Sequence, residues 1–364
     1  MVEGEVQVVA WYWKWRHEVV ELKLVDKVER IEAPVYKSVG GPIFKIAITT
    51  ACRMDCLYCP FRAGSSCARI FWQPEKLVRV FMTLYRHGVV KGIFLTSGYY
   101  SDSDRIVEQM LEVVEKLRKI GYKGYVHVRL MPGTSKHLIR EALRLCDRVG
   151  INVEAPSKHH FSEIAPSKGD WRHDIIDRLV YAASIAGKPD KVDTQFVVGA
   201  SGESDREILE TSYWLIGRGI GRLHYSPYTP IPGTPLARKR PPTQYDRVYR
   251  LYQAWSLMRY YGYSLDRIKL ALREDGMLVK TRDLKRVIAE RLGIGREYRV
   301  DPLEAKLEEL LLVPGIGPQT AHRIVEMREK GRLTLDVLRR ILGGRWRKAV
   351  RYLDLTRLPG KRLL

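Results

Sequence analysis

The residues from 44 to 230 alternate between short apolar runs and longer amphipathic segments, and this rhythm leaves few folds open to the chain. Apolar runs such as 44–49 and 91–98 have the length and composition of buried strands. Segments such as 73–88 and 101–121 have helical spacing, and the second begins with capping Ser and Asp residues. About six such units predict a parallel sheet with right-handed crossovers. Because a full TIM barrel has about eight units, we expect an open (βα)6 barrel.

Three cysteines, Cys52, Cys56 and Cys59, follow the first predicted strand in the run TACRMDCLYCP, with the spacing C-x3-C-x2-C. Thiolates this close on one loop can hold one face of a cuboidal [4Fe–4S] cluster and leave the fourth iron open. A structural zinc site is one alternative, but zinc prefers four ligands and paired C-x2-C knuckles, and the sequence has no second knuckle. Buried thiols without a metal are the other alternative.

The two remaining cysteines are Cys67 and Cys146. Cys146 lies at an apolar position of a predicted helix, and we expect it in the core. Cys67 is predicted to pack without a chemical role, with a reactive thiol near the active site as the alternative. This usage does not suit a disulfide framework and is typical of a reducing, cytoplasmic compartment.

The chain of 364 residues carries a net charge of +21, and most of it lies in the last third. Residues 236–300 hold 16 basic and 7 acidic side chains, and residues 319–364 hold 13 and 4. This asymmetry predicts a polyanionic partner for the C-terminal part. Asn152 is the only asparagine, which together with the abundance of charge favours a thermophilic source.

The sequence shows neither a membrane span nor the layout of a signal peptide. The aromatic run over 8–25 alternates and predicts a strand or hairpin. We therefore expect a cytoplasmic protein with no membrane partner.

The segment LEELLLVPGIGPQTAHRIVEMRE, residues 307–329, looks like a helix-hairpin-helix module. Gly315 and Gly317 would let the backbone approach a phosphate, and the helix that begins near Pro318 would present free N–H groups. Such contacts bind the phosphate backbone without reading sequence. Protein contacts or plain packing are the alternatives. The predicted nucleic-acid-binding residues are Arg62, Gly315, Gly317, Thr320 and Arg323, with Arg328, Lys330 and Arg332 as further phosphate contacts.

The cysteine run, with aromatic Tyr58 before its third cysteine, closely resembles that of the radical SAM enzymes. The resemblance implies a partial TIM-like barrel in which S-adenosylmethionine (SAM) binds the fourth iron of the cluster. It also implies that the cluster, reduced by an electron donor such as ferredoxin or flavodoxin, cleaves SAM to methionine and a 5′-deoxyadenosyl radical. The three cysteines are then the catalytic and metal-binding residues.

Several residues at predicted strand ends become cofactor candidates through this resemblance. Ser97 and Gly98 match the small-residue turn that receives the SAM amino group, although Tyr99 stands where the family often has an acid. Asn152 and Glu154 are candidates for the ribose hydroxyls and Arg129 for the SAM carboxylate; a salt bridge between Glu154 and Arg129 is the structural alternative. The complete predicted cofactor set is Tyr58, Ser97, Gly98, Arg129, Asn152, Glu154 and Gly199, the last in a loosely matching adenosine element.

An Arg-Ser-Ser sequence after the third cysteine, with the LTSG, INVEAP and RLYQAW segments, resembles one branch, the putative DNA modification or repair radical SAM proteins. The resemblance runs from about residue 40 to the C-terminus. It implies modification or repair of nucleic acid, of DNA in preference to RNA. The alternatives are radical SAM modification of a tRNA base, such as methylthiolation, and a non-catalytic iron–sulfur protein that binds nucleic acid.

We expect four parts: a strand or hairpin extension over 1–40, the barrel over 41–240, a basic helical bridge over 241–300 and an all-α helix-hairpin-helix module over 301–364. The bridge is rich in aromatic residues. Tyr249, Tyr252 and Trp255 are predicted to pack it onto the barrel, with base stacking as the alternative.

Overall fold

The computed structural model describes residues 16–23, 28–38, 40–281 and 283–360 and divides the chain into two compact units. The first unit holds Met1–Glu203 and Trp214–Thr243, and the second holds Ser204–Tyr213 and Gln244–Leu364. The segments expected as a separate bridge and a separate helix-hairpin-helix module therefore lie together, from residue 244 onward, in one unit.

An eight-stranded sheet forms the centre of the first unit, with its strands in chain order. Strands β3 to β8 are parallel, which confirms the partial (βα)6 barrel, and β1 and β2 add an antiparallel hairpin beside β3. Of the run expected as a strand or hairpin over 8–25, residues 16–23 form β1, and the rest lies outside the described residues. The strands are β1 (Arg16–Lys23), β2 (Val28–Ser38), β3 (Gly41–Ala47), β4 (Gly92–Thr96), β5 (Tyr125–Arg129), β6 (Arg148–Gly150), β7 (Val192–Val198) and β8 (Arg222–Pro227).

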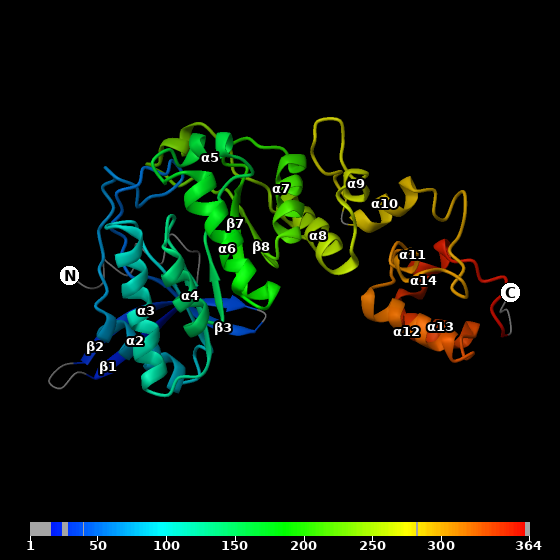
Figure 1. The fold of residues 1–364 in the computed structure, drawn as a ribbon, viewed down its shortest axis with the longest axis horizontal. Coiled ribbons are helices and arrows are strands. Elements are labelled where there is room, and N and C mark those ends of the chain that lie inside the picture. The colour runs from blue at the N-terminus through cyan, green and yellow to red at the C-terminus, as the bar shows by residue number, and fades with distance from the viewer. Residues whose placement is uncertain (1–15, 24–27, 39, 282, 361–364) are drawn as a thin grey trace. The chain divides into compact units, whose positions relative to one another are not determined.

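Helices α2, α3, α4 and α6 lie along one side of these strands (Figure 1). Their apolar stripes face the sheet; Phe81 of α2, for example, stacks on Phe44 of β3 with ring centroids 6.4 Å apart. The Asp102 side chain accepts a hydrogen bond from the Arg105 N–H and so caps the start of α3, as expected. The elements between the strands are α2 (Pro74–Arg86), α3 (Ser103–Lys119), α4 (Lys136–Leu145), α5 (Lys158–Ile164), the π-helical turn η1 (Trp171–Ile176), α6 (Asp177–Ile185), η2 (Pro189–Lys191) and α7 (Asp205–Gly217), and η3 (Pro235–Arg238) follows β8.

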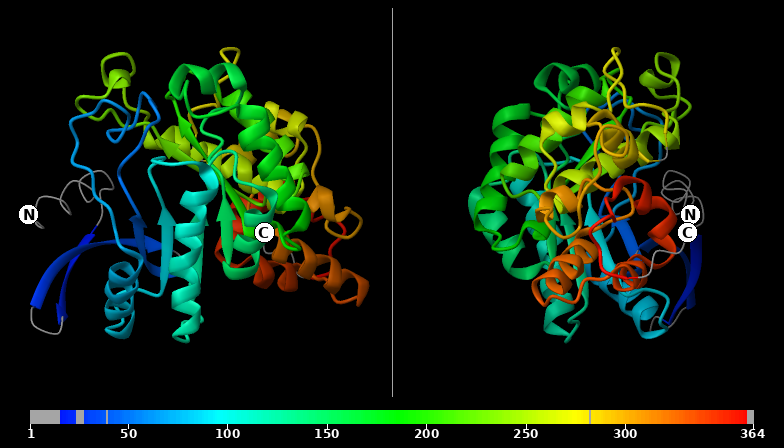
Figure 2. Two further views of the ribbon diagram at one scale, coloured as in Figure 1. Left: turned by 60° about the vertical axis from the view of Figure 1, so that its left-hand side comes forward. Right: turned by 90° about the vertical axis from the view of Figure 1, so that its right-hand side faces the viewer.

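The loops that leave the C-terminal ends of the parallel strands gather at one rim of the sheet, and the blue loop after β3 is among them (Figure 2, left). In barrels of this kind, that rim carries the active site.

The second unit is helical, apart from isolated bridges such as Leu272 with Leu278. Fully buried Leu310, Ile324 and Leu338 form part of its own core. Its elements are α8 (Tyr245–Tyr261), α9 (Leu265–Lys269), α10 (Leu284–Arg291), α11 (Leu307–Leu310), α12 (Pro318–Glu329), α13 (Leu335–Leu342), η4 (Gly343–Arg345), α14 (Trp346–Ala349) and η5 (Val350–Tyr352). Within the described part of the chain, no helix has the length and apolarity needed to cross a membrane.

Candidate functional site

The cysteine loop, residues 48–72, leaves β3 and returns to lie beside its own start. Thr49 and Phe71 form an antiparallel bridge, and the Thr50 N–H donates to the Ile70 carbonyl over 3.0 Å. The Thr49 hydroxyl donates to the same carbonyl over 2.6 Å. Both threonines are fully buried, so these bonds satisfy polar groups that would otherwise be costly. Their position before the first cysteine thus fixes both ends of the loop.

Arg69 organises the interior of the same loop. Its guanidinium donates to the carbonyls of Thr50, Phe61 and Arg62 over 2.9, 2.7 and 2.9 Å, and to the Ser65 hydroxyl over 3.1 Å. A rigid fork with five N–H donors suits several carbonyls held in one place. Sequence reasoning missed Arg69, because one arginine among 63 basic residues carries no signal of its own.

The three cysteines project from this ordered loop as free thiols, Cys56 buried and the other two half-buried. The Cys59 N–H donates to the Cys56 carbonyl over 3.1 Å, which closes a tight turn between them. Burial raises the pKa of Cys56 to about 11 and that of Cys59 to about 12, and neighbouring thiols add to the rise. Among the described residues, no three His, Cys, Asp or Glu side chains converge on one metal ion. The thiolates of a cuboidal cluster bind different irons, so they need not converge in this way.

The turn after β4 packs directly against the cysteine loop. The Gly98 N–H donates to the Thr49 carbonyl over 2.7 Å, and the Arg53 N–H donates to the Tyr99 carbonyl over 2.8 Å. A Cβ atom on Gly98 would lie 2.2 Å from the carbonyl oxygen of Ala51. Gly98 is therefore needed because two backbones meet here, which is a physical reason for the small residue at this turn.

The segment that follows α5 also contacts the cysteine loop. The Leu57 N–H donates to the Ile164 carbonyl over 2.8 Å. The Asp55 N–H donates to the Ser167 hydroxyl, and the Ser167 N–H donates to the Asp55 carboxylate, each over 3.0 Å. The loop is thus held from a second side by residues more than a hundred positions later.

Half-buried Lys168 and buried Glu154 form an ion pair next to the cysteines. Burial lowers the pKa of Lys168, but the charges of Glu154 and Cys56 outweigh burial and raise it overall. Glu154 is the one residue other than glycine with positive φ in the described chain, at +62°, and its side chain is fully buried. A residue held in this conformation costs about 1–3 kcal/mol, and such strain is concentrated at functional sites. Sequence reasoning selected Glu154 and missed Lys168.

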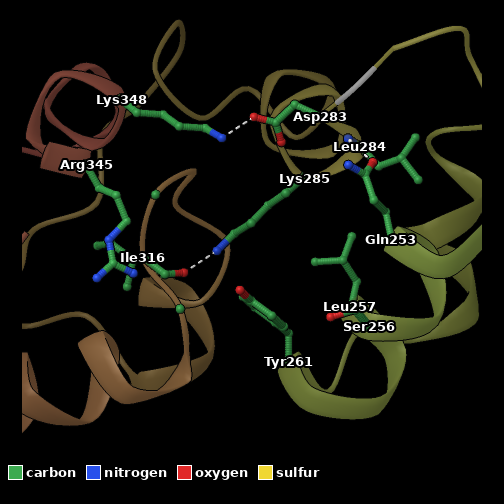
Figure 3. Close-up of a pocket in the computed structure, with 12 residues that line it drawn as sticks. Gln253, Ser256, Leu257, Tyr261, Asp283, Leu284, Lys285, Ile316, Arg345 and Lys348 are labelled. Atoms are coloured by element: carbon green, nitrogen blue, oxygen red, sulfur yellow. Dashed lines mark hydrogen bonds and ion pairs between the residues drawn. The ribbon is translucent and has the colours of Figure 1, made fainter. Parts of the chain in front are cut away.

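The second unit contains the hairpin between α11 and α12. Gly315 has φ of +94°, which requires glycine, and Gly317 precedes the first turn of α12. A pocket of about 280 Å³ lies beside the hairpin, lined by α8, α10 and the η4–α14 segment (Figure 3). The residues shown there include the cations Lys285, Arg345 and Lys348.

Two of these cations already have protein partners. Lys285 donates to the Ile316 carbonyl of the hairpin, and Lys348 pairs with Asp283 (Figure 3). Burial lowers the pKa of Lys285 to about 7. The pocket therefore combines glycine backbone and three basic side chains with one acid, Asp283.

Two family models match the chain. The model of the Radical SAM superfamily matches residues 46–215, which include the cysteine loop. The chain contains a radical SAM domain. The model of the helix-hairpin-helix motif matches residues 303–326, around the glycine hairpin. Members of the radical SAM superfamily bind a [4Fe–4S] cluster, which the cysteine spacing predicted, and SAM, which the resemblance implied.

Individual relatives are distant. Threonylcarbamoyladenosine tRNA methylthiotransferase MtaB of Thermotoga maritima is 26% identical over 225 residues, covering 56% of this chain and 49% of that protein. The chain thus spans about half the length of this curated relative. Methylornithine synthase (PylB) is 16% identical with a TM-score of 0.49, covering 60% of this chain and 63% of that one. A radical SAM methyltransferase from Sphaerobacter thermophilus is 15% identical with a TM-score of 0.47, covering 66% and 74%.

The residues around the radical SAM cysteines fit a polar ligand. Within the described part of the chain, Asn152 Oδ1 and Glu154 Oε2 are buried and have no hydrogen-bond partner, which is costly unless a ligand supplies donors. Both atoms accept hydrogen bonds, and SAM brings hydroxyl and ammonium donors. Cys52, Cys56 and Cys59 would hold the cluster. Lys168 is the cation beside them.

Arg129 is placed differently from the expected salt bridge with Glu154. Its guanidinium donates to buried Asp193 over 2.7 and 3.4 Å, and His127 and His224 bond the same carboxylate. Burial raises the pKa of Asp193, but the charges of Arg129 and His127 hold it well below its usual value. The structural alternative that joined Glu154 to Arg129 is therefore wrong, because each residue has another partner. The assignment of Arg129 to the SAM carboxylate stays a prediction.

Three other predicted cofactor residues lie in the loops at this rim. Tyr58 lies within the cysteine loop, and its side chain forms a hydrogen bond with Cys56. The Ser97 hydroxyl donates a hydrogen bond to the Gly98 carbonyl over 2.9 Å. Gly199 has φ of +87°, and its N–H donates to the Glu203 carboxylate. Gly199 is thus a turn residue in a loop that Glu203 organises. The roles of these residues toward SAM stay predictions.

The predicted nucleic-acid-binding residues differ in their exposure. Arg323 is exposed on α12, whereas Thr320 is buried. Arg62 folds back, with its Nε 3.4 Å from the Asp55 carbonyl. Arg328, a further predicted phosphate contact, donates to the Ala305 carbonyl over 2.7 Å. Of this set, Arg323 and the two hairpin glycines are the best placed to meet a phosphate backbone.

Proposed function

We propose that this chain is a radical SAM enzyme that modifies or repairs nucleic acid, with DNA preferred to RNA. One observation carries the proposal: a radical SAM domain and a helix-hairpin-helix motif occur in the same chain. The second supporting observation is the excess of basic residues around the motif, 16 against 7 over residues 236–300 and 13 against 4 over residues 319–364. The preference for DNA rests on the resemblance of the sequence to the putative DNA modification or repair branch of the radical SAM proteins.

Each residue of the barrel rim would have its own role in binding the cluster and SAM. The three cysteines would hold the cluster, Arg69 would keep their loop in one conformation, and the buried acceptors of Asn152 and Glu154 would orient SAM. When bound, the cluster and SAM supply one-electron cleavage of SAM to a carbon radical that can abstract hydrogen. A base or sugar in a duplex would have to leave the stack to reach this rim.

The enzyme claim is tested by anaerobic reconstitution of the full chain. We expect about four irons per chain and release of 5′-deoxyadenosine that depends on SAM and dithionite. Replacing the three loop cysteines by serine should abolish both. Cys67→Ser is the matched control and should keep both, because Cys67 lies beyond the third cysteine. A chain that binds iron but never cleaves SAM would contradict the enzyme claim and favour a non-catalytic iron–sulfur protein.

The substrate claim is tested by mass spectrometry of nucleosides from a host with and without this protein. We expect a modified or restored deoxynucleoside that depends on the protein and is lost in the triple cysteine variant. A change found only in ribonucleosides would overturn the preference for DNA. A change in neither pool would refute action on nucleic acid.

Modification of RNA is the second candidate, because a tRNA methylthiotransferase is 26% identical to part of this chain. The cysteines argue against methylthiolation in particular. A second cluster would need its own ligands, and only Cys67 and Cys146 remain. Cys146 is buried in the core, as predicted from its helical spacing. The ribonucleoside measurements in the mass spectrometry experiment distinguish RNA modification from DNA modification.

A further inference from the structure

Helix α8 of the second unit carries a row of exposed tyrosines. Tyr245, Tyr249, Tyr252 and Tyr260 are 67%, 53%, 36% and 44% exposed. At 100° per residue these positions fall on one face of the helix, opposite a buried face that includes Leu251 and Met258. With a rise of about 1.5 Å per residue, the row is about 22 Å long. We call it the tyrosine row.

Packing inside the chain accounts for only part of this row, because the Tyr252 and Tyr260 rings each meet the Trp255 ring edge-on, with centroids 6.4 and 5.4 Å away. The sequence predicted that Tyr249, Tyr252 and Trp255 pack the bridge onto the barrel. Trp255 is buried and Tyr249 is more than half exposed, and the packing of most of these residues onto the barrel stays a prediction. Four large aromatic side chains thus share one helix face, and each is at least 36% exposed; exposed apolar groups gathered on one face mark interaction sites.

A basic pocket adjoins the row. It has a volume of about 380 Å³ and is lined by Tyr249, Arg250 and Lys280, with Gln244, Thr281 and the acid Asp246. The Nε of Arg250 is buried and finds no hydrogen-bond partner among the residues that the structure describes. An unpaired guanidinium N–H is costly unless an acceptor fills the pocket. The residues from 244 to 364 carry 27 Lys and Arg against 15 Asp and Glu, so the expected acceptor is an anion.

We propose that the tyrosine row and this pocket bind a single-stranded stretch of nucleic acid, with bases stacked on the tyrosines and a phosphate at Arg250 and Lys280. Aromatic rings stack on any unpaired base, and an Arg fork pairs with phosphate oxygens. The bases of an intact duplex are stacked on each other and offer no free face. The inference rests on the proposed function, and it narrows the substrate to nucleic acid with unpaired bases at the contact. It differs from the helix-hairpin-helix contact, which involves backbone only.

The test is fluorescence anisotropy of the full-length chain with a labelled 20-nucleotide oligo(dT). Comparison probes are the same strand in a duplex and the same strand with abasic sites. Because stacking contributes about 1–3 kcal/mol per base, we expect Tyr249→Ala with Tyr252→Ala to weaken single-strand binding by at least about 30-fold. The matched Phe double variant should stay within about threefold, since it keeps the rings. Tyr298→Ala, at a residue 50% exposed outside α8, should have no effect.

Abasic sites should weaken wild-type binding and leave the alanine double variant almost unchanged. If the alanine double variant binds single strands as tightly as wild type, with an unchanged melting curve, the tyrosine row has another occupant and the inference is overturned. If wild type binds duplex but shows no dependence on bases, the inference also fails while the proposed function stands. If wild type binds no nucleic acid at all, both fail together.

Discussion

Gly98→Ala tests the central contact of the candidate site, where the turn after β4 meets the cysteine loop. The added Cβ atom would lie 2.2 Å from the Ala51 carbonyl oxygen, 2.9 Å from its carbon and 3.2 Å from the Thr49 oxygen. All three are backbone atoms, so no side chain can rotate away. Ordinary contacts require about 3.5 Å, and the two backbones must therefore separate by about 1 Å.

The cost of that separation has two parts. Overpacking of a close contact typically costs about 1–3 kcal/mol. The 2.7 Å bond from the Gly98 N–H to the Thr49 carbonyl would be lost or weakened, which adds about 1 kcal/mol. We expect the free energy of unfolding to fall by about 2–4 kcal/mol, with the structural effect concentrated at the loop that carries the cysteines. Iron content after reconstitution should fall from about four per chain to below about one.

Gly217→Ala is the matched control for this substitution. Gly217 ends α7, and a Cβ atom there meets nothing within 4 Å. Alanine in a helix should be neutral or stabilise by up to about 1 kcal/mol. Iron is measured by a colorimetric assay, and stability by urea unfolding of the metal-free protein. Wild-type iron content and an unchanged urea midpoint in Gly98→Ala would refute the close packing of these two loops.

Three further predictions concern the same barrel. Asp193→Asn should cost about 3–5 kcal/mol in urea unfolding, because it leaves the buried Arg129 cation without its partner; a loss under about 1 kcal/mol would contradict this. Burial lowers the pKa of His127 in the folded chain to about 4, whereas the imidazole in the unfolded chain titrates at about 6.5. Between these pH values the unfolded chain binds a proton that the folded chain does not bind. The free energy of unfolding should therefore fall by about 3 kcal/mol as pH drops from 6.5 to 4. His127→Phe should flatten that slope, and an unchanged slope would refute the assignment. Arg69→Lys should lower iron content almost as much as Arg69→Leu, because an ammonium cannot replace the fork, and rescue by Lys would argue against this.

The architecture of the barrel was accessible from sequence because it depends on local patterns. Apolar runs of strand length between amphipathic helices predicted the six parallel strands, and the position of the cysteines after the first predicted strand predicted the rim that carries the site. Gly98, Asn152 and Glu154 were also accessible, since each lies at the end of a predicted strand. Their neighbours at the rim then follow from the topology of a parallel sheet.

The partners of these residues were not accessible, because they depend on contacts between distant segments. Lys168 comes from the loop after α5, and nothing in its sequence neighbourhood marks it as the partner of Glu154. Asp193, the second residue of β7, is the partner of Arg129 in place of the expected Glu154. The tyrosines of α8 were ambiguous for another reason. Tyrosine is common on both buried and exposed faces, so spacing alone does not say which face is packed.

The contacts between the cysteine loop and residues 164–168 imply an order of events during protein synthesis. Asp55 and Ser167 exchange hydrogen bonds across 112 positions of the chain. A ribosome-bound chain that ends before Ser167 cannot close these bonds, although all three cysteines have already been made. Iron that arrived earlier would meet a cysteine loop with many conformations. Iron that arrives later meets an ordered loop, so binding no longer includes the entropy cost of ordering it. We therefore expect cluster insertion to follow synthesis of most of the barrel, with the loop acting as a receptor that is already shaped.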